Sequence, residues 1–310
     1  MWRDILVAAA VIVVLPAIST LLTPLYALYR EQMGISLVTL TLIYAVYVIG
    51  NLGALLVFGG LSDAVGRRPV VLASFAIAAL SAVTFMFARH GWELGLARVF
   101  SGLGVGIGSG AVAAWLVELM GLQDRSQAAI ILTTANFIGL GAGALLAGAL
   151  ADHAPAPLLL PFVVYLAVLA VTTALILRTP ETVAPETLRP FALTWPRLGV
   201  PADLRASFVA PAISGFGSMA LVGFYACLAP GILAQTLGVR SNLAAGAILF
   251  ELAAVAAATI LMTRSVPSAR AMWVSLLLIV PAIALVVVAQ ISASLLVMIA
   301  ATALCGVAAA

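Results

Sequence analysis

The feature that most constrains this chain is a series of ten long apolar runs separated by short polar segments. Each run has about 20 residues, the length that an α-helix needs to cross the hydrocarbon core of a bilayer. The runs lie at residues 5–28, 38–60, 70–88, 94–117, 127–150, 158–177, 208–233, 243–262, 272–290 and 293–310. The sequence therefore predicts an all-α membrane protein that crosses the bilayer repeatedly.

The composition supports this fold class and argues against several functions. Of the 310 residues, 65% are hydrophobic and 8% are charged, whereas soluble proteins carry about 25% charged residues. The arginines stand between apolar runs, in a pattern that does not predict a nucleic-acid surface. Cys227 and Cys305 lie inside apolar runs, so we expect them to be packing residues. Because no histidines, carboxylates or nucleophiles gather at one depth, we expect neither an enzyme nor a metal or cofactor site.

The distribution of arginines predicts the orientation. With the N-terminus in the cytoplasm, Arg30, Arg89 and Arg240 fall on the outer side and Arg98 lies within the fourth run, whereas the other arginines fall on cytoplasmic segments. Cationic residues are retained on the cytoplasmic side of membrane proteins. We therefore expect a multi-pass protein of the cell inner membrane, with the lipid bilayer as its surroundings and a cytoplasmic N-terminus.

A long polar segment divides the chain. Residues 178–206 carry charges of both signs and repeated prolines, which prevent a continuous helix. The predicted units are a bundle of six helices at residues 1–177, a cytoplasmic linker at 178–206 and a bundle of about four helices at 207–310.

One short turn between the second and third runs carries fixed charges. It reads Gly60-Leu61-Ser62-Asp63-Ala64-Val65-Gly66-Arg67-Arg68-Pro69. A tight charged turn at a membrane face can hold helices together in one conformation and release them in another, although arginines there also serve orientation alone. Glu118, near the same end of the fourth run, is a candidate ion-pair partner. The candidate gating residues are Gly60, Asp63, Gly66, Arg67, Arg68 and Glu118.

This turn resembles the loop between the second and third helices of the major facilitator superfamily, whose pattern is roughly Gly-x-x-x-Asp-x-x-Gly-Arg-Arg. The resemblance implies two helical bundles that rock about a site near the middle of the membrane, which is secondary transport by alternating access. The superfamily normally has twelve spans. Since ten are present and the last run reaches Ala310 without a charged flank, we expect a chain truncated within its second bundle.

Within that superfamily, Thr23-Pro24-Leu25-Tyr26 and the charged turn are similar to bacterial proton-linked drug-efflux members. The resemblance implies a monomeric antiporter that couples protons to the efflux of a small organic molecule. The glycines of the fifth run resemble the antiporter motif, but they lack its proline, which weakens the inference of export. The alternatives are a proton-coupled uptake permease, a ten-helix exporter of the drug/metabolite type and an inactive truncated transporter.

Two ionisable residues inside apolar runs are candidates for proton coupling. Arg98 lies about four residues into the fourth run, where it either extends outward to water or acts in transport. The segment from Arg98 to Gly104 resembles the superfamily's fourth-helix motif, which is linked to proton coupling. Glu251 lies about eight residues into the eighth run. It is either a carboxyl that binds and releases protons or a neutral carboxyl hydrogen-bonded between helices.

Four polar residues are candidates for substrate binding. Tyr44, Tyr47 and Asn51 follow an i, i+3, i+7 spacing and share one helix face, and Asn136 lies near the middle of the fifth run. These side chains suit a cavity for an amphipathic organic molecule, although tyrosines near a membrane interface are also common.

A glycine stripe in the fourth run predicts close helix packing. Gly102, Gly106 and Gly110 recur every four residues and therefore share one face. A phosphate-binding loop is excluded because no strand precedes the stripe.

Overall fold

The computed structural model describes residues 2–121, 125–183, 199–201 and 203–310. Within these ranges the secondary structure is helical, and no strand is present. The long helices are α1 (Trp2–Leu21), α3 (Leu37–Phe58), α5 (Arg67–Phe87), α6 (Gly91–Met120), α7 (Arg125–His153), α8 (Leu160–Ile176), α9 (Arg205–Gln235), α10 (Asn242–Met262), α11 (Ser268–Ile291) and α12 (Leu295–Ala309). Among the described residues, eight segments are long and apolar enough to cross a membrane, and α8 and α12 are apolar but shorter. The predicted all-α membrane fold is confirmed.

Two segments differ from the helices expected from sequence. The first run is interrupted: α1 ends at Leu21, and a 3-10 turn, η1 (Thr23–Leu25), leads into α2 (Tyr26–Met33). Pro24 has no N–H to donate to the preceding turn, so the α-helical hydrogen-bond pattern stops there. The charged turn itself contains a short helix, α4 (Leu61–Val65).

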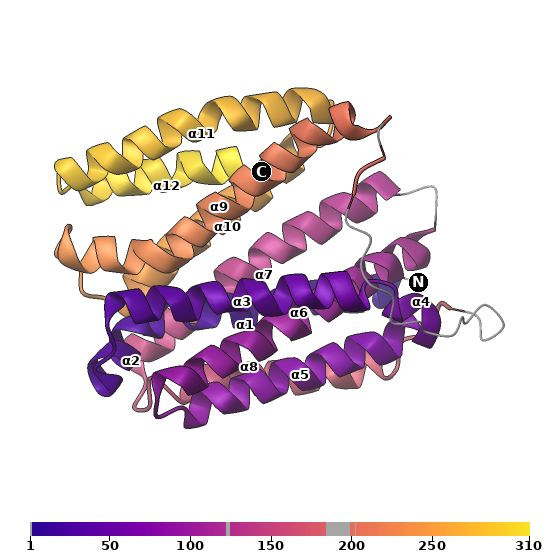
Figure 1. Cartoon of the computed structure of the whole chain (residues 1–310), viewed down its shortest axis with the longest axis horizontal. Helices are drawn as coiled ribbons and strands as arrows, with labels where there is room; N and C mark the ends of the chain where they lie inside the picture. Colours follow the sequence, from indigo (N-terminus) through magenta and orange to yellow (C-terminus); the bar gives the residue numbers. More distant parts are fainter. Residues whose placement is uncertain (1, 122–124, 184–198, 202) are drawn as a thin grey trace.

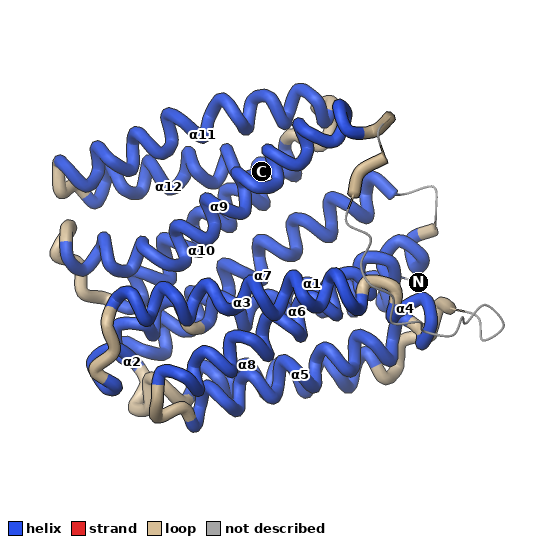
Figure 2. The backbone as a smooth tube through the Cα atoms, viewed as in Figure 1, coloured by secondary structure: helices blue, strands red, loops and turns tan. Residues whose placement is uncertain are grey.

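The long helices run back and forth, so their connections gather at two ends of the molecule (Figures 1 and 2). We call the end that holds α4 and the N-terminus the turn end. The opposite end holds α2, the connection from α7 to α8 and the start of α10, and we call it the cap end.

The helices form two halves, with α1–α8 in the first half and α9–α12 in the second (Figure 1). Each half buries its own apolar core, but Phe137 and Ala144 of α7 belong to the core of the second half. Large apolar side chains such as Leu42, Phe216 and Leu277 are exposed, as helices that face lipid require. The division at residues 1–177, 178–206 and 207–310 stays a prediction, and residues 184–198 and 202 of the linker lie outside the described residues.

Glycines allow α7 and α10 to approach closely across the two halves. A side chain at Gly148 would overlap the carbonyl of Asn242, and one at Gly246 would overlap the carbonyl of Ala144. Nearer the turn end, a cavity of about 440 Å³ lies between Ser126 and neighbouring residues of α7 and residues of α9–α12. The halves are therefore in contact along α7 and α10, and cavities lie between them at both ends: about 440 Å³ at the turn end, and about 430 Å³ and 960 Å³ beside α2 and α9 at the cap end.

The predicted glycine stripe packs α6 against α3 at two of its three positions. A side chain at Gly102 would overlap the carbonyl of Tyr47, and a Cβ at Gly106 would lie 2.6 Å from the Cβ of Ala54. Gly110 has no heavy atom within 4 Å of an added Cβ, so close packing is confirmed at Gly102 and Gly106 only.

Candidate functional site: charged contacts at the two ends and polar groups between them

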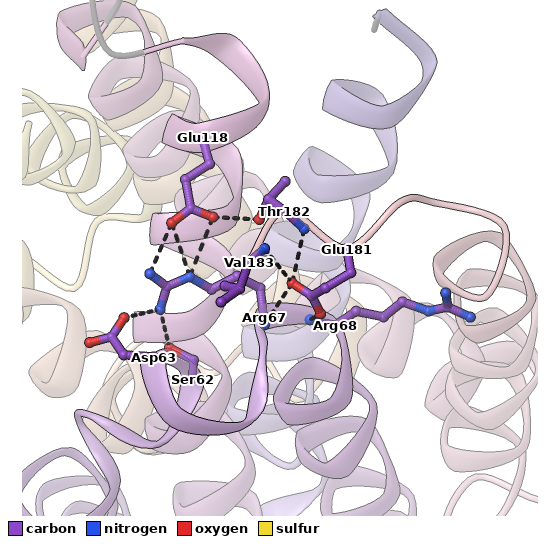
Figure 3. Close-up of polar contacts among 8 residues, drawn as sticks. All are labelled: Ser62, Asp63, Arg67, Arg68, Glu118, Glu181, Thr182 and Val183. Atoms are coloured by element: carbon purple, nitrogen blue, oxygen red, sulfur yellow. Dashed lines mark hydrogen bonds and ion pairs between the residues drawn. The ribbon is translucent and has the colours of Figure 1, made fainter. Parts of the chain in front are cut away.

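The charged turn is held by an acid that the sequence did not single out. Gly66, between α4 and α5, has a φ of 103°, which favours glycine. The first N–H groups of α5 have no partner within the helix. In the structure the amides of Arg67 and Arg68 donate to the carboxylate of Glu181 at 3.0 Å and 2.9 Å (Figure 3). Glu181 therefore caps α5, and a Cβ at Gly66 would lie 2.8 Å from its Oε2.

Arg67 is the centre of the contacts around this turn (Figure 3). Its Nη2 lies 2.9 Å from Oε1 of Glu118, and its Nη1 lies 2.5 Å from Oδ1 of Asp63. Nη1 also donates to Oγ of Ser62 at 2.6 Å. The Arg67 side chain is only 11% exposed. The expected ion pair between Arg67 and Glu118 is present, and the planar guanidinium bridges acids from α4 and α6.

The other candidate gating residues differ in their contacts. Arg68 is partly exposed, and its side chain donates to the carbonyl of Leu177 at 2.8 Å. The Asp63 side chain is 65% exposed. An added Cβ at Gly60 would meet nothing within 4 Å, so no close contact requires glycine there.

We call Ser62, Asp63, Arg67, Arg68, Glu118 and Glu181 the turn cluster. Among the described residues, the polar partners of this cluster belong to the first half and to the first residues of the linker, such as Thr182. The cluster therefore ties the start of the linker to the first half, and it makes no polar contact with the described helices of the second half.

A second acid connects the two halves at the cap end. Asp152, in the last turn of α7, accepts hydrogen bonds from the amides of Asn242 and Leu243 at 3.1 Å and 2.9 Å. It also accepts from Oγ of Ser241 at 2.7 Å and from Nδ2 of Asn242 at 2.8 Å. These groups belong to the start of α10, where unpaired N–H groups and the helix dipole favour a carboxylate. We call this set of hydrogen bonds the cap contact.

The two capping acids, Glu181 and Asp152, were missed from sequence. One signal was present: Ser241 directly precedes the eighth run and is a typical N-cap residue, and in the structure its Oγ accepts from the amide of Ala244 at 3.1 Å. Nothing in the local pattern shows that Asp152, about 90 residues earlier, reaches this helix start.

Arg98 is completely buried, and the outward-extending alternative is wrong. Its Nη1 donates to the carbonyl of Ser19 at 2.5 Å, and its Nη2 donates to the hydroxyl of Tyr26. The guanidinium carbon lies 4.9 Å from the ring centre of Tyr44 and 6.0 Å from that of Tyr47. These distances are typical of cation–π contacts. Two predicted substrate-binding tyrosines therefore surround the predicted proton-coupling arginine.

Glu251 and Arg98 are not brought together. Glu251 lies on α10 in the second half, and it is partly buried. It is near enough to Tyr225 for an electrostatic interaction. Among the described residues, no hydrogen-bond or ion-pair partner of its carboxyl is present, so the hydrogen-bonded alternative finds no support.

Asn136 lines a cavity of about 220 Å³ within the first half, together with Pro16, Ser109 and Thr133. Tyr44, Tyr47 and Asn51 do not line this cavity, so the four predicted substrate-binding residues do not share it. The buried Oδ1 of Asn51 has no hydrogen-bond partner among the described residues. Among the residues that the structure describes, no group of three or more His, Cys, Asp or Glu residues is arranged to hold a metal ion.

Comparisons with known proteins agree with this architecture. The family model of the Major Facilitator Superfamily matches residues 8–310. An uncharacterised MFS-type transporter, YhjO of Bacillus subtilis (strain 168), is 26% identical over 133 residues, which are 43% of this chain and 33% of that protein. The transporter paaT of Penicillium rubens is 30% identical over 124 residues, which are 40% of this chain and 22% of that protein. The matched segments thus span a third or less of these relatives.

Two solved structures have a similar fold. The human organic anion transporter MFSD10 (TETRAN) has a TM-score of 0.68 at 20% identity, over 99% of this chain and 84% of that chain. A bacterial homologue of the human lysosomal transporter Spinster, in an inward-facing and unoccupied conformation, has a TM-score of 0.71 at 17% identity, over 99% of this chain and 72% of that chain.

The family match covers nearly the whole chain, and it excludes both the ten-helix drug/metabolite arrangement and a membrane-embedded enzyme. The order of long helices and the division into two halves agree with that match. This chain belongs to the Major Facilitator Superfamily of membrane transporters.

Proposed function

We propose that this protein is a secondary active transporter that moves a small organic molecule across the cell membrane by alternating access. The observation that carries the proposal is a pair of helical halves that meet along α7 and α10 and border cavities on either side of that contact. The cap contact and the α7–α10 glycines join the halves, and cavities lie between them at the turn end and at the cap end. Two units that share such a contact can rock about it, as alternating access requires.

The arginine bias supports a cytoplasmic turn end, because cationic residues are retained on that side. In that orientation the cavity at the turn end faces the cytoplasm, where an exporter loads its substrate. Thr133 lines both the cavity beside Asn136 and the cavity at the turn end, so the two spaces adjoin and offer a substrate path. Each chain supplies both halves, which suits a monomer in the inner membrane.

Proton coupling is assigned to Glu251 as the group that takes up and releases the proton. An arginine does not give up its proton in proteins, so Arg98 contributes only through its fixed charge and the groups that it orders. Gating is assigned to the turn cluster and the cap contact together, with the cap contact as the part that joins the two halves.

The test is proton movement in proteoliposomes that carry a pH-sensitive dye. A panel of amphipathic organic molecules is added to the wild-type chain, to Glu251→Gln and to the control Asp203→Asn, an exposed acid at the turn end. We expect wild type and Asp203→Asn to link substrate movement to proton movement, and Glu251→Gln to lose that link while remaining folded. Unchanged coupling in Glu251→Gln removes Glu251 as the proton carrier. Substrate movement without proton movement in wild type contradicts proton coupling.

A further inference from the structure

The surroundings of Arg98 leave a buried positive charge without an acidic partner. The residue is 0% exposed, and no ion pair to Arg98 is present among the described residues. Its Nε is buried and has no hydrogen-bond partner there. A charge removed from water is costly unless it is paired, and an ionisable group inside a membrane protein is by default a candidate for function. The tyrosine rings and the Ser19 carbonyl solvate this cation only in part.

Tyr26 connects Arg98 to a neighbouring cavity. The Tyr26 hydroxyl accepts a hydrogen bond from Nη2 of Arg98, and Tyr26 also lines a cavity of about 430 Å³. Because its oxygen accepts a charge-assisted hydrogen bond, its own O–H is polarised and available as a donor. Tyr26 thus contacts Arg98 and also forms part of the cavity wall.

The rest of that cavity favours an anion. Arg30 is the charged residue in its wall, and Thr41, Gln235 and Gln290 add neutral polar groups. Among the described residues, no Asp or Glu lines the cavity; Glu31 borders the adjoining cleft instead. The remaining wall is largely apolar, and the volume is within the range of small-molecule sites.

The cavity lies between the two halves. Its walls come from α2 and α3 of the first half and from α9 and α11 of the second, as Thr41 and Gln290 illustrate. A molecule bound there contacts both halves, and it is therefore placed to respond to their relative movement.

From this geometry we infer that the cavity binds an amphipathic organic anion, with its carboxylate or sulfonate against the Tyr26 hydroxyl and the Arg30 guanidinium and its apolar part against α9. The inference rests on the proposed function, because it names the substrate class of the transporter. The fixed charge of Arg98 polarises Tyr26 without touching the ligand.

The experiment compares three probes of nearly equal shape on the full chain in nanodiscs of zwitterionic lipid. The radiolabelled probes are 1-naphthaleneacetate, its neutral amide and the cation 1-naphthylmethylammonium. We expect the carboxylate to bind about tenfold more tightly than the amide and the ammonium to bind more weakly still, because a hydrogen bond to a charged group is stronger than one to a neutral group. Equal binding of the three, tightest binding of the ammonium, or no binding of the carboxylate overturns the inference.

Two variants locate the site. Arg30→Gln removes an exposed cation and is expected to weaken carboxylate binding about tenfold while leaving amide binding unchanged. Tyr26→Phe keeps the ring and removes the donor, and it is expected to have a similar effect. The matched control is Arg89→Gln, an exposed arginine at the same end that does not line the cavity. If Arg89→Gln weakens binding as much as Arg30→Gln, the site is not this cavity.

Two further measurements identify the source of the anion and test this inference separately from the proposed function. Nanodiscs with one third anionic phospholipid show whether a lipid headgroup competes for the site: reduced probe binding assigns the anion to lipid, and unchanged binding assigns it to a dissolved molecule. Distances between the two halves, measured without any ligand, test alternating access separately. If the distances show that the halves alternate but the cavity does not bind the anionic probe, the inference is rejected and the proposed function stands.

Discussion

The turn cluster and the cap contact use the same chemistry for different purposes. In each, a carboxylate accepts hydrogen bonds from the first amides of a helix: Glu181 at the start of α5 and Asp152 at the start of α10. Glu181 and Thr182, at the start of the linker, join described partners in the first half, whereas Asp152 reaches from the first half to the second. An acid at a helix start therefore stabilises one rigid unit in the first case and a separable interface in the second.

This difference changes the assignment of the gate. The sequence singled out the charged turn because its charges lie close together. In this conformation, however, the polar groups of the turn cluster bond to the first half and to the start of the linker. Rigid units can rock only when contacts between them break and form again. The cap contact and the α7–α10 glycines are among the polar and packing contacts that must break when the cap end opens. A gating role of the turn cluster itself stays a prediction.

The largest expected effect is on the turn cluster. Arg67→Ala leaves Glu118 in a partly buried position without its cation, and it also removes the bridge to Asp63. We expect a loss of roughly 2–4 kcal/mol in stability, measured as a lower Tm in detergent. The partly exposed Arg68, whose side chain has no carboxylate partner among the described residues, supplies the control, since Arg68→Ala should cost well under half as much. Equal losses would show that the buried ion pairs do not stabilise this half.

The second effect is on the packing between the halves. Gly148→Val places a side chain against the carbonyl of Asn242, and overpacking of this kind costs about 1–3 kcal/mol. The strain is relieved when α7 and α10 separate, so we expect the population with an open cap end to increase. Gly223→Val on α9 is the matched control because its added side chain meets nothing within 4 Å and the residue does not line the cavities between the halves. Cysteine accessibility at the cap end measures both variants, and equal accessibility contradicts the close approach.

The smallest expected effect comes from replacing the two capping carboxylates, and it compares the turn cluster with the cap contact directly. Asp152→Asn and Glu181→Gln each replace a capping carboxylate by the amide of the same length. Each should weaken its cap by about 1 kcal/mol, which is about a fivefold change in an equilibrium. For Asp152→Asn the change appears in the ratio of open to closed cap ends; for Glu181→Gln it appears only as a lower Tm. If Glu181→Gln also shifts that ratio, the two regions do not differ as described.

The helices were predictable because their signal is local. Length and apolar composition alone indicate a membrane span, and the ten long helices follow the predicted runs. The Arg67–Glu118 ion pair was also accessible from sequence, because both residues come at the same end of neighbouring spans and carry opposite charges.

The remaining features depend on partners far away in the chain. Whether Arg98 extends outward or lies buried is decided by Ser19 and Tyr26, which belong to the first helices. The capping roles of Asp152 and Glu181 depend on which helix starts come near them, and no local pattern contains that information. The same holds for Asn136, whose cavity excludes the three polar residues of α3 that were grouped with it.

The most direct test of the account measures distances between the halves at both ends of one molecule by electron spin resonance. With Cys227 and Cys305 replaced, spin labels are attached at His153 and Arg240 for the cap end, or at Ser126 and Met262 for the turn end; all four positions are exposed. We expect Asp152→Asn to increase the long-distance population of the cap-end pair and, by the same proportion, the short-distance population of the turn-end pair. A change at the cap end that leaves the turn-end distances unaltered would contradict alternating access through this contact.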